Sequence, residues 1–147
     1  HAFVDYAHTP DALENVCKTL KELCTGKLIT VFGCGGDRDK GKRPRMGAVA
    51  ARYSDFCIVT SDNTRSETPE DIIRDIISGM PEKGVVAIAD RAEAIKQAAA
   101  LAAKSDIILI AGKGHETYQE FADGRIDFND FVHIRRALMP ETGTLEQ

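Results

Sequence analysis

The sequence lacks both a long apolar run and a long basic run. Its longest apolar stretch, residues 107–111, is far shorter than the roughly 18–20 residues that cross a bilayer, so we expect no membrane-spanning segment. Basic residues cluster only at 40–43, and 23 acidic residues outnumber 19 basic ones for a net charge of −4. This balance removes the electrostatic basis for general nucleic-acid binding, and leaves small anionic ligands as candidates.

The sequence also lacks a CxxC pair, since its four cysteines stand at positions 17, 24, 34 and 57. Reduced thiols and a cytoplasmic protein are therefore expected. The chain opens at His1 on a strand-like pattern and without Met, which suggests that it was cut from a longer protein. Its 147 residues, 43% of them hydrophobic, suffice for a single core. We predict one domain over residues 1–139 and a polar tail over residues 140–147.

Short apolar runs rich in β-branched residues alternate along the chain with stretches of helical period. The strands are expected at residues 2–5, 27–33, 56–61, 85–89 and 106–111. The helices are expected at residues 10–24, 44–52, 69–80, 92–103 and 130–138. Runs at 118–121 and 126–128, joined by a turn at 122–125, predict a β-hairpin. The pattern predicts an α/β fold: a Rossmann-like, doubly wound, mostly parallel sheet with a C-terminal β-hairpin.

Two of the expected helices begin with the same pair of residues. Thr9 precedes Pro10, and Thr68 precedes Pro69. Proline is well suited to the first helical position, and a threonine hydroxyl just before it can accept a hydrogen bond from a free backbone N–H. Both threonines are therefore predicted to cap their helices.

Four polar segments directly follow expected strands, at residues 5–10, 33–39, 61–65 and 112–116. In an open α/β sheet the ligand crevice lies outside the carboxyl ends of the strands. Each segment alone is typical of ordinary turns, because Gly, Asp and Asn are the usual turn residues. Since all four fall at the same edge, we predict that they form one binding site.

The glycine-rich segment resembles two nucleotide-binding motifs and satisfies neither. Arg38 stands where the dinucleotide motif G-x-G-x-x-G requires its third glycine. Arg43 stands where a Walker A loop requires the Ser or Thr that holds magnesium. The loop can still present backbone N–H groups to an anion at the start of the following helix.

Charged residues in these segments suit a zwitterionic ligand. Arg38 and Arg65 come from different loops, and a guanidinium grips a carboxylate with two hydrogen bonds. Asp62 and Glu116 can hold an ammonium group of the same ligand. The alternative is that each arginine only pairs with a nearby acid, at position 37, 39, 62 or 67.

Other reactive side chains point to neither a metal site nor a nucleophile. His8 and His115 lie in these segments, but no His-x-x-His or similar ligand spacing occurs, so we expect no metal held by the protein. Cys34 lies in the glycine-rich loop, and a small buried side chain is favoured over a nucleophile. Cys17 and Cys24 lie on the apolar stripe of their helix and are assigned to the core.

Together, four motifs resemble the C-terminal domain of the Mur ligases, in particular of members that add diaminopimelate. They are VDYAHTPDAL at 4–13, VFGCGGDRDKGKRP at 31–44, SDNTR at 61–65 and AGKGHE at 111–116. The resemblance runs from about residue 3 to about residue 138. It implies that ATP phosphorylates the γ-carboxylate of a UDP-N-acetylmuramoyl dipeptide, and that the amine of an incoming amino acid then attacks the acyl phosphate. Two preceding domains would carry the P-loop, most contacts to ATP and Mg²⁺, and the UDP-sugar site.

The resemblance also implies roles for individual residues. The incoming amino acid would contact Arg38, Asp62, Asn63, Thr64, Arg65, Gly112 and Glu116. Asp5 would hydrogen-bond the ATP ribose, and His8 would approach the phosphates. The implied partners are small-molecule substrates and the preceding domains of the same polypeptide, with no nucleic acid and no membrane. This domain alone is expected to be inactive.

One residue departs from the pattern of the diaminopimelate-adding members, which have D-N-P-R where this chain has Thr64 before Arg65. Proline restricts φ in the unfolded chain as well as in the folded one. A threonine in its place therefore adds an entropic cost of ordering the loop, of order 0.4–1 kcal/mol. Because the arginine is retained, meso-diaminopimelate is the expected amino acid and lysine is the alternative. Two other classes of protein remain as alternatives. One is a free-standing nucleotide- or amino-acid-binding module, and the other is a nicotinamide-dependent oxidoreductase, which the broken glycine motif disfavours.

Overall fold

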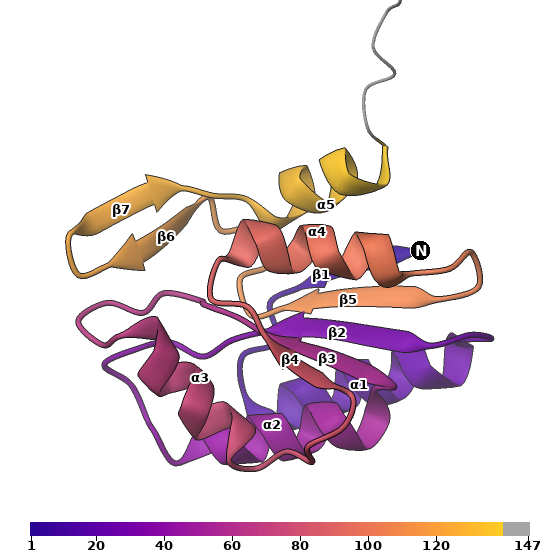
Figure 1. Ribbon diagram of the computed structural model, residues 1–147, viewed down its shortest axis with the longest axis horizontal. Coiled ribbons are helices and arrows are strands. Elements are labelled where there is room, and N and C mark those ends of the chain that lie inside the picture. The colour runs from indigo at the N-terminus through magenta and orange to yellow at the C-terminus, as the bar shows by residue number, and fades with distance from the viewer. Residues whose placement is uncertain (140–147) are drawn as a thin grey trace, which may run out of the picture.

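A computed structural model describes residues 1–139, and its centre is a five-stranded sheet in which every pair of neighbours is parallel (Figure 1). The strand order is β1-β5-β2-β3-β4. The strands are β1 (Ala2–Asp5), β2 (Leu28–Phe32), β3 (Phe56–Val59), β4 (Val85–Ala87) and β5 (Ile107–Ala111). The predicted parallel sheet is confirmed. The predicted polar tail, 140–147, lies outside the described residues.

Helices cover both faces of the sheet (Figure 1). They are α1 (Pro10–Leu23), α2 (Lys42–Tyr53), α3 (Pro69–Ile77), α4 (Arg91–Leu101) and α5 (Asp130–Leu138). Helices α1, α2 and α3 bury their apolar stripes on one face, against β2 side chains such as Phe32. Helices α4 and α5 pack on the other face, against Ile29 and Val31. Because successive strand residues point to opposite faces, β2 serves both layers, and the fold is doubly wound as predicted.

The C-terminal hairpin forms a sheet of its own. Strands β6 (Tyr118–Phe121) and β7 (Gly124–Asp127) pair antiparallel. The sequence placed positions 124 and 125 in the turn, which is wrong: Gly124 pairs with Phe121, so only two residues remain for the turn. The hairpin touches the segment after β3, where the backbone N–H of Arg65 donates to the carbonyl of Glu120 at 3.0 Å. It therefore reaches the carboxyl edge of the main sheet.

Element boundaries differ from the predictions by at most three residues, and one predicted cap is wrong. Helix α2 begins at Lys42, two residues before Pro44, which is tolerated because a first-turn N–H has no partner within the helix. The Thr9 hydroxyl accepts from the N–H of Ala12 at 3.2 Å and caps α1 as predicted. Thr68 occupies the cap position of α3, but its hydroxyl accepts no such hydrogen bond. Within residues 1–139, no helix is long and apolar enough to cross a membrane.

Candidate functional site

The four polar segments meet in one cleft of about 430 Å³ at the carboxyl edge of the sheet. Its walls come from the segments after β1, β2, β3 and β5, because parallel strands present their carboxyl ends on the same side. The lining residues are Tyr6, His8, Thr9, Gly35, Arg38, Asp39, Lys42, Asp62, Asn63, Arg65, Gly112 and Glu116. Seven of the nine residues that the sequence assigned to binding thus line a single cleft.

Asp5 and Thr64 are the two assigned residues that do not line it. The Asp5 carboxylate accepts the backbone N–H of Ala7 at 2.8 Å, a local turn interaction, and Asp5 faces a neighbouring hollow of about 530 Å³ that His8 also lines. Thr64 is 1% exposed, and its carbonyl packs against Gly36. Direct contact between Thr64 and a ligand in this cleft is therefore not supported by its position.

The two arginines are held by backbone carbonyls rather than by the acids that the sequence suggested. Arg38 Nη1 donates to the carbonyl of Asp37 at 2.9 Å, and within residues 1–139 Arg38 forms no ion pair. Arg65 Nη1 donates to the carbonyl of Gly36 at 2.9 Å, and its Nε lies 3.5 Å from the Glu120 carboxylate on the hairpin. The alternative of pairing with residues 37, 39, 62 or 67 is therefore wrong for both.

A buried ammonium group pairs with two acids of the cleft, and sequence reasoning missed it. Lys113 is fully buried, and its Nζ donates to Asn63 Oδ1 at 2.9 Å and to Glu116 Oε1 at 3.3 Å. It also lies 3.6 Å from Asp62 Oδ1. The two acids expected to hold a ligand ammonium therefore already share a lysine. The only signal in the sequence was its place between two glycines of the last motif.

Asp62 and Glu116 differ in their access to the cleft. The Asp62 side chain is 11% exposed, and its Oδ1 also accepts the N–H of Asn63 at 2.7 Å. Gly112, at φ +114°, lets the backbone approach this carboxylate, because a Cβ there would lie 2.7 Å from Asp62 Oδ2. The Glu116 side chain is 25% exposed. Asp62 thus orders the loop, and Glu116 is the acid more open to a ligand.

The cysteines have no features of a nucleophile. Cys34 is 3% exposed, and burial raises the pKa of its thiol to about 12, so the thiol stays protonated near neutral pH. Cys17 is buried in the core as predicted, whereas Cys24 ends α1 and is only half-buried. Among residues 1–139, no three His, Cys, Asp or Glu side chains lie close enough together to hold a metal ion.

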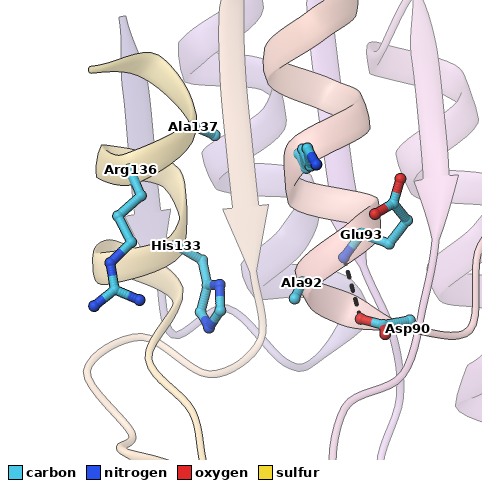
Figure 2. A pocket seen from close by; sticks show the side chains of 7 residues that line it. Asp90, Ala92, Glu93, His133, Arg136 and Ala137 are labelled. Atoms are coloured by element: carbon cyan, nitrogen blue, oxygen red, sulfur yellow. Dashed lines mark hydrogen bonds between the residues drawn. The ribbon is translucent and has the colours of Figure 1, made fainter. Parts of the chain in front are cut away.

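A separate hollow of about 280 Å³ lies between the first turns of α4 and the helix α5 (Figure 2). Asp90 and Glu93 come from the α4 side, where the Glu93 N–H donates to the Asp90 carboxylate at 3.1 Å. His133 comes from α5 and stacks on Phe128 with ring centroids 4.3 Å apart. None of the four polar segments lines this hollow, so the cleft at the sheet edge remains the candidate binding site.

The doubly wound sheet and its polar cleft define a Rossmann-like domain, with the cleft at the carboxyl ends of the strands, where ligand sites of such folds lie. Residues 1–114 match the family described as "Mur ligase, glutamate ligase domain". The chain therefore belongs to the Mur ligase family, in which it corresponds to that domain, and the resemblance read from its motifs is confirmed.

Several proteins similar to this chain share one name. The chain is 57% identical over 136 residues to the "UDP-N-acetylmuramoyl-L-alanyl-D-glutamate--2,6-diaminopimelate ligase" of Coxiella burnetii, covering 92% of this chain and 28% of the relative. It is 59% identical over 130 residues to the protein of that name from Syntrophomonas wolfei, covering 86% and 27%. A solved structure under the same name superposes with a TM-score of 0.89 at 51% identity, covering 93% and 28%. The chain thus spans little more than a quarter of these relatives.

Proposed function

We propose that residues 1–139 form the amino-acid-binding domain of an ATP-dependent ligase that adds meso-diaminopimelate to UDP-N-acetylmuramoyl-L-alanyl-D-glutamate in the cytoplasm. The observation that carries the proposal is the placement of Arg38 and Arg65 on different walls of one cleft that also contains Glu116. The shared name of relatives 51–59% identical to this chain supports the same substrate.

The cleft matches the charges of diaminopimelate, which carries an ammonium and a carboxylate at each end. Arg38 and Arg65 supply the hydrogen-bond donors for a carboxylate at one end, and Glu116 accepts from the ammonium beside it. Lysine has no second carboxylate, so it would leave a guanidinium in the cleft without its anion. A site built to bind a polar group discriminates strongly against an analogue that lacks it. The proposal therefore favours diaminopimelate over lysine.

The domain contributes to the reaction by orientation. ATP phosphorylates the carboxylate of the UDP-muramoyl dipeptide and leaves as ADP. The free amine of the bound amino acid then attacks the acyl phosphate, the C–O bond to phosphate breaks, and the amide forms with release of inorganic phosphate and a proton. Holding one end of diaminopimelate presents the other amine to that carbon, which converts a bimolecular step into an effectively unimolecular one. We assign Mg²⁺ and most ATP contacts to the preceding domains, with His8 near the phosphates and Asp5 near the ribose.

The test replaces Arg65 by Ala in the full-length ligase. Loss of a charge-assisted hydrogen bond, about 1.5–3 kcal/mol, should lower kcat/KM for meso-diaminopimelate roughly 10- to 100-fold. Any residual use of L-lysine should change far less, because lysine makes no contact through a second carboxylate. Arg45→Ala, on the exposed side of α2, is the matched control. Equal losses for both amino acids, or better use of lysine by the unchanged enzyme, would contradict the proposal.

A further inference from the structure

Two side chains, Arg43 and Glu67, join the loops that carry Arg38 and Arg65; the first is fully buried and the second is 16% exposed. Arg43, on α2, is fully buried and donates from Nη2 to the carbonyl of Gly35 at 3.1 Å. Its guanidinium also grips the Glu67 carboxylate with two hydrogen bonds, at 3.0 and 2.7 Å. Glu67 Oε2 in turn accepts the backbone N–H of Asp37 at 2.7 Å. Arg43 and Glu67 therefore connect the loop after β2 with the loop after β3.

Further contacts run between the same two loops. The N–H of Gly36 donates to the carbonyl of Asn63 at 2.8 Å, and Ser66 donates from both its N–H and its hydroxyl to the Asp37 carboxylate. Gly36 has no room for a side chain, because a Cβ there would lie 1.9 Å from the carbonyl oxygen of Thr64. The relative position of the two loops is therefore tightly specified.

The backbone is strained at the point where each arginine leaves its loop. Asp37, directly before Arg38, has φ 55°, and Arg65 itself has φ 51°. Within residues 1–139, these are the only non-glycine residues with positive φ. Such a conformation is unfavourable for a residue with a side chain, and it persists where surrounding contacts over-determine it, commonly at binding sites.

The same contacts leave a buried donor unsatisfied. Within residues 1–139, Arg43 Nε has no hydrogen-bond partner. Buried donors without a partner are rare in folded proteins, and strain is one of their recognised causes. The arrangement therefore fits a role in shaping the cleft.

We propose that Arg43 and Glu67 are positioning residues that fix the spacing and direction of Arg38 and Arg65, and thereby the selectivity for an amino acid with a second carboxylate. The inference rests on the proposed function of the cleft. Neither residue lines the cleft, so each acts only through the loops. Removing the Glu67 charge should loosen both arginines together.

The experiment compares Glu67→Gln with Asp75→Asn in the full-length ligase. Asp75, on α3, is the other carboxylate bound to Arg43, at 3.0 Å, and within residues 1–139 its side chain forms no hydrogen bond or ion pair with either loop. Glu67→Gln should raise KM for meso-diaminopimelate on the order of tenfold, with KM for ATP and for the UDP-muramoyl dipeptide unchanged. Asp75→Asn should leave all three KM values unchanged. Ser66→Ala, a milder change at an exposed residue, should raise KM for diaminopimelate to a smaller extent.

Amide hydrogen exchange, followed by mass spectrometry over residues 33–39 and 61–67, separates this inference from the proposed function. Faster exchange in both segments for Glu67→Gln but not for Asp75→Asn is expected whatever amino acid the enzyme uses. If the loops loosen but the unchanged enzyme does not use diaminopimelate, the proposed function fails and the positioning role stands. Unchanged exchange and KM in Glu67→Gln, or equal effects of Glu67→Gln and Asp75→Asn, would overturn the positioning role. If Glu67→Gln does not fold, the same comparison is made with Ser66→Ala.

Discussion

At the scale of single residues, the two glycines that flank the Arg38 loop differ in how much space surrounds them. An added Cβ at Gly36 would meet a backbone carbonyl at 1.9 Å, whereas at Gly41 its nearest neighbour is the flexible Asp39 carboxylate at 3.1 Å. Gly36→Ala should therefore cost about 1–3 kcal/mol of unfolding free energy. Gly41→Ala, at φ −64°, should be neutral or slightly stabilising. Urea denaturation of the two variants checks the difference, and equal effects would contradict this account of the loop.

Glu67 makes stability depend on acid pH. Two hydrogen bonds from Arg43 and one from the N–H of Asp37 hold the pKa of its carboxyl at about 2, well below its ordinary value of 4.5. Its contribution is complete above the ordinary value and is lost as pH falls from 4.5 towards 2. As pH falls through this interval, the free energy of unfolding should therefore decrease less for Glu67→Gln than for the unchanged chain. Urea denaturation at pH 5 and pH 3 measures this, with Glu22→Gln on the exposed surface of α1 as the control.

At the scale of helices and strands, the two threonine caps make a matched pair. Thr9 accepts the N–H of Ala12, and loss of such a cap costs about 1 kcal/mol, so Thr9→Ala should destabilise the chain by that amount. Thr68 accepts no capping hydrogen bond, so Thr68→Ala should change stability by only a few tenths of a kcal/mol. Thermal unfolding of both variants tests this, and a larger loss for Thr68→Ala would show that its hydroxyl does cap α3.

The sequence predicted the elements well because the strands of the main sheet are short, mostly apolar runs and the helices carry an apolar stripe. It also predicted the cleft, since parallel strands bring segments distant in the chain to one edge. It did not predict the burial of Lys113, which depends on how loops from three strands pack together. Nor did local pattern indicate the bond between Arg43 and Glu67, because the two residues lie on different elements.

At the scale of the whole molecule, one buried ion pair joins the N-terminal ends of α4 and α5 to each other and to the sheet. Arg91, at the start of α4, binds the Asp130 carboxylate of α5 at 2.8 Å and donates to the carbonyls of Ser61 and Ala111, directly before Asp62 and Gly112. Both side chains are fully buried. The pair therefore holds in place the backbone that leads into two cleft residues, Asp62 and Gly112.

Removing one member should leave an uncompensated buried charge. Asp130→Ala is expected to cost about 3–5 kcal/mol of unfolding free energy. Lys21→Met, which removes the more exposed pair between Lys21 and Asp55, should cost at most about 1 kcal/mol. Urea denaturation of the two variants checks the ranking, and similar losses would contradict the importance assigned to burial.

The position of β5 between β1 and β2 has a consequence for synthesis on the ribosome. Strands β2, β3 and β4 can pair in the order in which they emerge, but β1 finds its only partner in the sheet when residues 107–111 have been made. Until then the sheet has a gap between β1 and β2, where β5 belongs, and the first and last motifs have no common edge. A nascent chain of this protein therefore acquires its binding cleft only after β5 has been made, and chains that stop before β5 contain most of the residues of the cleft without forming it.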